Sequence, residues 1–301
     1  MRFKVRAPAS SANLGPGFDT IGLALDLWNE LEIDPAGTPG EIRLEGPEAG
    51  PLNERENLAL SVMATLAAAY GRELPPFALT AWTAVPVARG LGSSAAALVT
   101  GLLAADHLLE LRLTREELYA VAWRMEGHGD NAGAALYGGA VLAVPLVPQA
   151  VVLCPGDVLG LVAVVFIPEM TGATWAAREV LPATIPHADA AFNVATVAGL
   201  VAGLLTRDRV LIAAGMHDRL HEPYRARLFP HLLPMVEAAR AAGAVGACLS
   251  GAGPAVLALV DPADAGAVAA ALTATARALG ISGVAVRLEP ARRGAHLVSE
   301  G

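Results

Sequence analysis

The chain has 301 residues, of which 54% are hydrophobic, and it carries a net charge of −8 with a sequence pI near 5.4. This composition predicts a globular protein of two domains or one large domain, and its acidity argues against a nucleic-acid or anionic-membrane surface. Cys154 and Cys248 lie far apart without the spacing of zinc ligands, which is typical of a reducing compartment. Residues 1–6 form a charged strand and leave no apolar segment for a secretory signal. We therefore expect a cytoplasmic protein with no nucleic-acid and no membrane partner.

The first half of the chain predicts both strands and helices. Apolar residues alternate with small or polar ones at 3–7 and at 21–33, which predicts one strand and then one or two more, with one buried face. The segment between them, P-A-S-S-A-N-L-G-P-G at 8–17, predicts a turn-forming loop. The uncharged run at 131–156 contains prolines and predicts strands and turns. The other expected elements are a short strand near 42–44, an apolar helix at 57–70 with Asn57 at its N-terminal side, and a strand at 77–87.

Residues 85–97, V-P-V-A-R-G-L-G-S-S-A-A-A, predict a phosphate site. Glycines allow the backbone to approach a ligand closely, and a serine stands where a helix begins that continues through Leu98, Leu102 and Leu109. The first-turn N–H groups of a helix lack partners and the helix dipole is positive there, so the loop favours an anion. Phosphate is the expected ligand, and a glycine turn without any ligand is the alternative.

Two better-known glycine loops do not fit this segment. A Walker loop needs a lysine on the terminal phosphates, and Lys4 is the only lysine of the chain. The pattern at 90–95 also matches a dinucleotide fingerprint, which a second strand should follow. Instead, the residues at 114–117, T-R-E-E, cap another helix. Neither a Walker loop nor a Rossmann unit is expected.

The helix that begins at Thr114 is expected to end near Glu126, with Gly127 as its C-terminal residue. A carboxylate at the negative end of a helix is disfavoured by about 0.3–1 kcal/mol. Two interpretations follow: Glu126 is exposed and eased by nearby Arg124, or a cation binds there. The dense polar run at 126–131, E-G-H-G-D-N, supports the cation, although a lone histidine is more often structural and D-N alone predicts a turn.

The second half predicts strands and helices around one antiparallel sheet, with a boundary near residues 150–157. The expected strands are at 160–167, 244–249, 255–260 and 284–288. The expected helices are at 174–181, 190–205, 229–242 and 264–279.

Four motifs together resemble the GHMP kinases, which are ATP-dependent kinases of small molecules. The resemblance covers nearly the whole chain. The segments at 86–96 and at 249–254, L-S-G-A-G-P, are similar to motifs that the whole superfamily shares. The segments at 8–19 and at 126–131 resemble the branch of the family that phosphorylates homoserine.

The resemblance implies an α+β fold with two domains. Residues 1–154 would form an ATP-binding domain of the ribosomal-protein-S5-domain-2 type, and residues 155–301 a ferredoxin-like domain whose last few residues can return to the first sheet. It implies ATP and Mg²⁺ as cofactors, with Ser94 and Glu126 as magnesium ligands. Without a lysine, the helix N-terminus, Mg²⁺ and Arg89 are expected to neutralise the phosphates. The implied ATP-binding residues are Asn57, Pro86, Arg89, Gly90, Leu91, Gly92, Ser93, Ser94 and Ala95.

The implied acceptor is L-homoserine, a zwitterion with a primary hydroxyl, so its site needs a carboxylate for the ammonium and a guanidinium for the carboxylate. The resemblance assigns this role to Asn13, Asp19, His128, Asp130, Asn131, Thr174, Arg178 and Arg225. Asn13, Asp19 and Glu126 are the expected catalytic residues of an in-line γ-phosphoryl transfer, and Asp19 is either a general base or an orienting acceptor. A homodimer is also expected.

Two other functions stay open at this level: a different GHMP kinase, such as one acting on mevalonate, and a non-catalytic sensor of ATP or a small molecule. Three positions depart from the pattern of the family. Gly129 replaces a proline, which predicts a looser loop. Ala173 replaces a serine near the substrate, and Thr196 stands where the family usually has an arginine.

Overall fold

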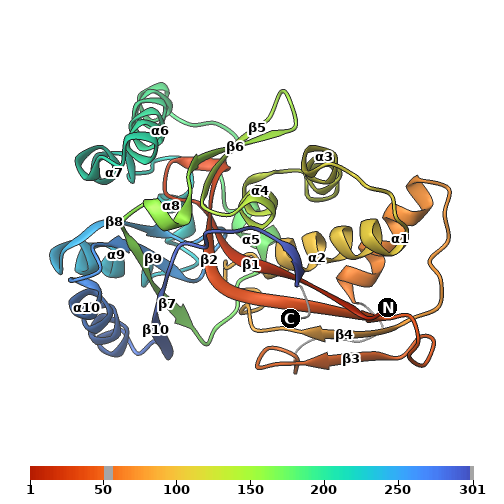
Figure 1. The fold of residues 1–301 in the computed structure, drawn as a ribbon. Helices are drawn as coiled ribbons and strands as arrows, with labels where there is room; N and C mark the ends of the chain where they lie inside the picture. Colours follow the sequence, from red (N-terminus) through yellow and green to blue (C-terminus); the bar gives the residue numbers. More distant parts are fainter. Residues whose placement is uncertain (51–56, 299–301) are drawn as a thin grey trace.

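The computed structural model describes residues 1–50 and 57–298 of the chain, which form two β-sheets flanked by helices (Figure 1). In these residues the first sheet has seven strands in the order β11-β1-β2-β4-β3, with β5 paired to β2 and β6 to β5. The strands of this sheet are β1 (Phe3–Asn13), β2 (Gly17–Asp34), β3 (Ile42–Glu45), β4 (Ala78–Trp82), β5 (Ala140–Val144), β6 (Gln149–Cys154) and β11 (His296–Val298).

The hairpin of β1 and β2 forms the centre of this sheet. The prediction of a loop at 8–17 was wrong, because β1 continues through Asn13. Pro8 has no N–H to donate, and the register shifts between Pro8 and Ala9 before pairing resumes. β2 is a single strand of 18 residues that pairs with β5 near Ile21 and with β4 near Glu32. This length brings the loop at 13–17 to the second sheet.

Four helices accompany the first sheet: α1 (Leu58–Ala69), α2 (Ser93–Leu108), α3 (Arg115–Glu126) and α4 (Asp130–Tyr137). The side chain of Asn57 caps α1 by accepting a hydrogen bond from Leu60 N at 3.0 Å. Thr114 and Glu117 form a capping box on α3, and Gly127 ends α3 with φ of 80°. Helix α4 was missed, since its small residues show no clear helical period and were interpreted as strands and turns.

The second sheet has four described strands in the order β10-β7-β9-β8, all antiparallel to their neighbours. This strand order, with helices between β7 and β8 and between β9 and β10, is ferredoxin-like and confirms the predicted α+β class. The strands are β7 (Val162–Pro168), β8 (Ala244–Leu249), β9 (Val256–Val260) and β10 (Gly283–Leu288). The helices are α5 (Thr174–Glu179), α6 (His187–Thr206), α7 (Arg209–Gly215), α8 (Glu222–Arg225), α9 (Leu232–Ala241) and α10 (Ala265–Ala278).

The two faces of this second sheet are both buried, but against different partners. Val164 and Phe166 pack with α9 and α10, whereas Ala163 and Val165 pack with α6, α7 and the β1–β2 hairpin. The second of these cores joins the two sheets. The strand β11 pairs with β1, so the first and the last described strands of the chain lie side by side in the first sheet. The boundary at residues 154 and 155 stays a prediction.

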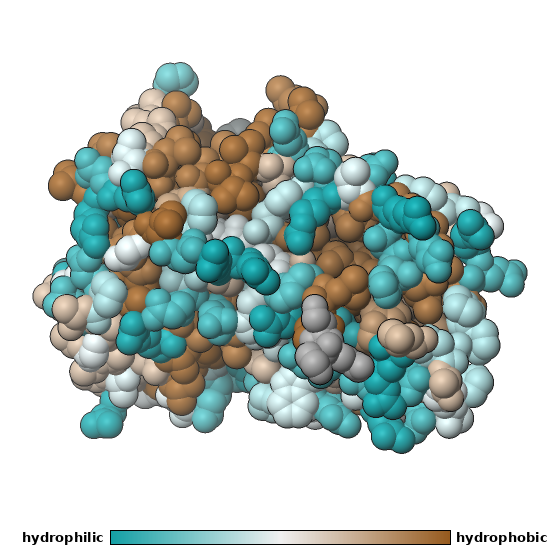
Figure 2. Space-filling model, viewed as in Figure 1, coloured by the Kyte–Doolittle hydropathy of each residue, from teal (hydrophilic) through white to brown (hydrophobic). Residues whose placement is uncertain are grey.

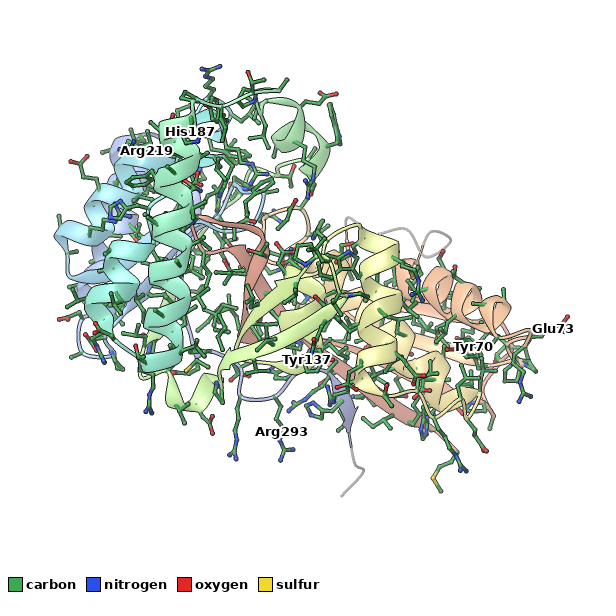
Figure 3. The ribbon with its side chains drawn as sticks, turned by 90° about the horizontal axis from the view of Figure 1, so that it is seen from above. Tyr70, Glu73, Tyr137, His187, Arg219 and Arg293 are labelled. Atoms are coloured by element: carbon green, nitrogen blue, oxygen red, sulfur yellow. The ribbon has the colours of Figure 1, made fainter. Side chains whose placement is uncertain are left out.

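Helix α6 is exposed along much of its length. Within the described residues it is the one helix long and apolar enough to cross a membrane, and 22% of its apolar window is buried. It lies along one side of the molecule, with His187 at its start (Figure 3). Figure 2 shows apolar surface in the upper left, where Figure 1 places α6 and α7.

Candidate active site

The loop at 86–92 joins β4 to α2 and bends through three residues with positive φ: Ala88 at 55°, Gly90 at 79° and Gly92 at 68°. A Cβ on Gly90 would collide with the carbonyl oxygen of Ser250, and a Cβ on Gly92 with the hydroxyl of Ser10. Both glycines are therefore required by close approach as well as by conformation. The expectation that a serine stands where the helix begins is confirmed, since α2 begins at Ser93. Gly92 is the N-cap, which leaves the Ser93 and Ser94 hydroxyls free of that role.

The segment at 249–254, which begins at the last residue of β8 in the second sheet, holds this loop in place. Ser250 is fully buried, and its Oγ donates to Gly90 O at 2.7 Å and lies 2.8 Å from Ser11 Oγ. Ala255 N donates to Arg89 O at 3.2 Å. The loop at 86–92 thus takes its shape from a distant segment, since Ser250 and Gly90 are 160 residues apart in the sequence.

The side chain of Arg89 is engaged away from the cavity. Its Nε donates to Pro168 O at 3.0 Å, its Nη2 to Glu169 O at 3.1 Å, and its Nη1 lies 3.3 Å from a carboxylate oxygen of Glu48. Among the ATP-binding residues expected from the sequence, Arg89 alone does not line the cavity. Its guanidinium joins the loop at 86–92 to the end of β7, and these contacts hold it away from the cavity.

A cavity of about 700 Å³ runs between the two sheets. At one end it is lined by apolar and aromatic side chains around Asn57, among them Leu44, Leu58 and the half-exposed Trp82. Such a surface suits a flat aromatic ligand group. Asn29, also on the wall, accepts hydrogen bonds from the N–H groups of Ala84 and Val85 at 2.9 Å and so shapes the start of the loop. Sequence analysis singled out neither Asn29 nor Trp82.

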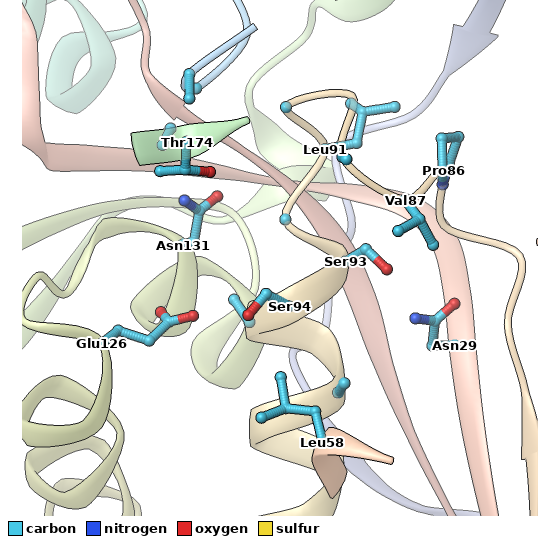
Figure 4. A pocket seen from close by; sticks show the side chains of 18 of the residues that line it. Asn29, Leu58, Pro86, Val87, Leu91, Ser93, Ser94, Glu126, Asn131 and Thr174 are labelled. Carbon is cyan, nitrogen blue, oxygen red and sulfur yellow. The ribbon is translucent and has the colours of Figure 1, made fainter. Parts of the chain in front are cut away.

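Glu126 ends α3 inside the cavity rather than on the surface. Among the described residues, two buried side-chain nitrogen or oxygen atoms have no hydrogen-bond partner, and Oε2 of Glu126 is one of them. Burial raises the pKa of this carboxyl to about 7. Figure 4 shows the carboxylate of Glu126 and the hydroxyl of Ser94 pointing toward one another from α3 and α2. A buried carboxylate and a hydroxyl at the phosphate end of a cavity form an oxygen donor set that suits Mg²⁺.

The other end of the cavity is built by the loop at 13–19. Asn13 and Asp19 have positive φ, 72° and 57°, which few non-glycine residues adopt. The Asn13 side chain holds this shape, since its Oδ1 accepts from Asp19 N at 3.0 Å and its Nδ2 donates to Gly251 O at 2.9 Å. The backbone of Asp19 is thereby fixed in the cavity wall.

Charged side chains gather at this end. The two guanidinium nitrogens of Arg178, on α5, donate to the two oxygens of Asp19 at 2.8 and 3.0 Å. His128 Nδ1 lies 2.7 Å from Asp130 Oδ1, and this hydrogen bond raises the pKa of His128. One ligand atom each of Asp19, His128 and Asp130 lies within 4.8 Å of the others. The cluster offers oxygen acceptors for a cationic group.

Arg225 lies on α8 and is almost fully buried beside this cluster. Its Nε donates to Ala177 O at 3.0 Å, and its Nη1 lies 3.1 Å from Gly251 O and 3.2 Å from His221 Nδ1. Burial lowers the pKa of Arg225 to about 10, so the group remains a cation at neutral pH. These contacts leave Nη2 of Arg225 for a ligand, because Nη2 donates no hydrogen bond to another described residue.

His221 contacts Arg225 from outside the cavity, and sequence analysis did not single it out. It is fully buried, and its Nε2 lies 2.7 Å from Gly15 O, so Nε2 carries the proton and Nδ1 accepts from Arg225. Burial lowers the pKa of His221 to about 4, which keeps it neutral. The signal in the sequence is its position four residues before Arg225, which places both on one face of a helical turn.

The structure explains one of the three departures at 129, 173 and 196. A Cβ on Gly129 would collide with Tyr119 and Trp123, and Gly129 O accepts from the Tyr119 hydroxyl at 3.2 Å, so close packing favours glycine here. Ala173 precedes α5 and gives it no side-chain cap. Thr196 bonds within α6 and does not line the cavity.

The remaining site residues expected from the sequence all line the same cavity. Asn131 Oδ1 accepts from Ser10 Oγ at 2.9 Å, which orients its amide beside the phosphate loop. Thr174 begins α5 opposite Asn131 (Figure 4). The cavity is lined by Asn13, Asp19, Asn57, Pro86, Gly90, Leu91, Gly92, Ser93, Ser94, Ala95, Glu126, His128, Asp130, Asn131, Thr174, Arg178 and Arg225.

Comparisons with known proteins agree with this geometry. The family models described as GHMP kinases N terminal domain and GHMP kinases C terminal match residues 57–139 and 200–278. A homoserine kinase of Moorella thermoacetica is 44% identical over 84% of this chain and 86% of its own, and one of Desulfitobacterium hafniense is 38% identical over 98% and 99%. The chain belongs to the homoserine kinases of the GHMP kinase family. A crystal structure of homoserine kinase from Cytophaga hutchinsonii matches 99% of this GHMP kinase and 97% of its own chain, with a TM-score of 0.88 and 30% identity.

As a GHMP kinase, the protein is an ATP-dependent phosphotransferase with a hydroxyl acceptor. The first turn of α2, which begins at Ser93 beside the cavity, has backbone N–H groups without intrahelical partners, and such groups suit phosphate oxygens.

Proposed function

We propose that the protein transfers the γ-phosphoryl group of ATP to the hydroxyl of L-homoserine, giving O-phospho-L-homoserine for threonine biosynthesis. One observation supports the acceptor above all. At the end of the phosphate-binding cavity, two guanidinium groups, Arg178 and Arg225, stand beside two carboxylates, Asp19 and Asp130. This pattern of opposite charges matches an amino-acid zwitterion, and a carboxylate without an ammonium would use only half of it.

The nucleotide would bind with its base near Asn57 and Trp82 and its phosphates on the start of α2. Mg²⁺ would be held by Ser94 and Glu126, which the buried and unpartnered Oε2 of Glu126 supports. The ion would neutralise the phosphate oxygens, which is the role of the lysine in a Walker loop. The residues of the chain position the hydroxyl in line with the γ-phosphorus, and Asp19 either accepts the hydroxyl proton or orients the acceptor.

The test is an ADP-release assay with L-homoserine, mevalonate and related alcohols as acceptors. We expect efficient turnover with L-homoserine and at most weak turnover with mevalonate. ADP release that depends on mevalonate and not on homoserine would assign another kinase of the family. No acceptor-dependent ADP release, despite ATP binding, would indicate a sensor.

We further propose that the enzyme works in the cytoplasm as a homodimer. The buried thiols of Cys154 and Cys248 are free, which suits a reducing compartment. An exposed and uncharged stripe on α6, including Val194 and Leu205, supports self-association through antiparallel pairing of two copies of this helix. Sedimentation equilibrium should give twice the mass of the chain, and Val194→Glu should shift it to the mass of one chain.

A further inference from the structure

The two arginines of the acceptor site are held in different ways. Arg225 is almost fully buried, and its bonds to Ala177 O, Gly251 O and His221 fix it in the fold. Arg178 has 41% of its side chain exposed, and its hydrogen bonds in the described residues all go to Asp19. Both guanidinium groups lie over the ring of Phe18, at 5.7 Å for Arg178 and 5.3 Å for Arg225. One arginine is a fixed part of the wall, and the other can be released.

The carboxylate of Asp19, the other member of the pair, can also be released. Its backbone N–H is fixed by Asn13, but its two carboxylate oxygens bond to Arg178 alone among the described residues. The Asp19 side chain is 33% exposed. Separation of the pair therefore breaks two charge-assisted hydrogen bonds and no other hydrogen bond that these two side chains make with the described residues. In the free protein, the anion and the cation that an amino-acid acceptor needs neutralise each other.

We infer that the Asp19–Arg178 ion pair occupies the acceptor site and is displaced charge for charge by a zwitterion. The ammonium of the acceptor takes Asp19 and its carboxylate takes Arg178, so each separated charge gains a new partner at once. A ligand with one charge breaks the same pair and leaves one member without a partner in a partly dehydrated cavity. The ion pair thus selects zwitterions, because a ligand with both charges gives Asp19 and Arg178 a new partner each. This inference rests on the proposed amino-acid acceptor.

A ligand without the carboxylate gives the sharpest test. Such a ligand, 3-amino-1-propanol, retains the hydroxyl and ammonium of homoserine, and its affinity is measured by calorimetry with a non-hydrolysable ATP analogue and Mg²⁺ present. In Arg178→Met the pair no longer exists, so we expect 3-amino-1-propanol to bind about tenfold more tightly than it binds the wild type, the factor that 1.4 kcal/mol gives. Homoserine should bind this variant more weakly. If Arg178 served only the carboxylate, the affinity for 3-amino-1-propanol would not change.

Arg178→Met also removes a positive charge that repels the ammonium of 3-amino-1-propanol. The same substitution in an Asp19→Asn variant separates this repulsion from the loss of the ion pair. In Asp19→Asn there is no ion pair, so Arg178→Met should no longer change the affinity for 3-amino-1-propanol. The same gain in both backgrounds would assign it to charge repulsion and overturn the inference. The inference is also overturned if Arg178→Met binds the amine no better than the wild type or not measurably. Far-UV circular dichroism checks that both variants fold.

Failure of this inference is distinguishable from failure of the proposed function. Wild-type turnover of L-homoserine in the ADP-release assay tests the function and does not depend on the ion pair. Turnover of homoserine with no gain for the amine in Arg178→Met rejects the exchange alone. Absence of homoserine turnover in the wild type rejects the acceptor and, with it, the inference.

Discussion

The two ends of the cavity bind charge by different means. The phosphate end uses backbone: a loop with three positive φ values, the first turn of α2, and two glycines that tolerate no side chain. The acceptor end uses charged side chains that are already paired, Asp19 with Arg178 and His128 with Asp130. Backbone N–H groups do not titrate, and hydrogen bonds from Ser250 and Ala255 hold the loop at 86–92, so the phosphate end is fixed before ligand arrives. The acceptor end must exchange partners to bind, which makes it the selective end.

The largest expected effect is on the phosphate end. Gly90→Ala would place a Cβ against the carbonyl oxygen of Ser250. We expect loss of ATP binding and a fall in kcat/KM of about 10³-fold or more, because a misplaced loop loses several phosphate contacts together. Gly71→Ala is the matched control, since Gly71 has φ of 62° and open space around its Cβ position. A Gly90→Ala enzyme as active as Gly71→Ala would contradict the role of close approach.

Next in size is the loss of the proposed metal ligand. For Glu126→Gln we expect kcat to fall by about 10²–10³-fold and the Mg²⁺ concentration needed for half-maximal rate to rise, as loss of electrostatic stabilisation at a phosphoryl group predicts. Glu116→Gln, at the exposed start of the same helix, is the control. The measurement is a Mg²⁺ titration of the initial rate. An unchanged titration in Glu126→Gln would rule out a metal contact.

At the acceptor end, Asp19→Asn separates two roles for the carboxylate. A general base contributes about 10²–10⁴-fold to the rate, so a fall of that size in kcat assigns proton removal to Asp19. If Asp19 only orients the acceptor, KM for homoserine rises and kcat changes by a few-fold. The assay is steady-state kinetics at saturating ATP. A variant with wild-type kcat and KM would exclude both roles.

Smaller effects are expected at His221, which touches Arg225 but not the cavity. His221→Gln removes the acceptor near Nδ1, whereas His221→Asn retains an oxygen near that position. We expect KM for homoserine to rise by about tenfold in the Gln variant and less in the Asn variant, with KM for ATP unchanged, since loss of a hydrogen bond to a charged group corresponds to about 1.5 kcal/mol or more. Equal rises in both KM values would indicate a general loss of structure.

The same residue gives the smallest effect, a pH dependence of stability. The pKa of His221 is lowered by burial from its ordinary 6.5 to about 4. Between these values the unfolded chain binds a proton that the folded chain does not, so the free energy of unfolding falls as the pH falls from 6.5 toward 4. The slope from one group is at most about 1.4 kcal/mol per pH unit. Urea titrations should show a shallower fall in His221→Gln than in the wild type, and parallel curves would contradict the assignment.

The sequence by itself determined the elements whose signals are local. The capping box at Thr114, the N-cap at Asn57 and the glycine loop before α2 depend on near neighbours, and the structure has them where they were expected. The predicted fold class was confirmed, although α4 was missed and β1 was ended too early.

Only the tertiary structure decided what the charged side chains do. Arg89 and Arg178 look alike in the sequence, yet one is bound to carbonyl groups outside the cavity and the other to Asp19 inside it. Asp19 and Arg178 are 159 residues apart, and Ser250 and Gly90 are 160 apart. The direction of a long side chain depends on which distant groups surround it. Local sequence therefore predicts a site made of backbone, whereas the pairing of a site made of charged side chains is set by the packing of the two sheets.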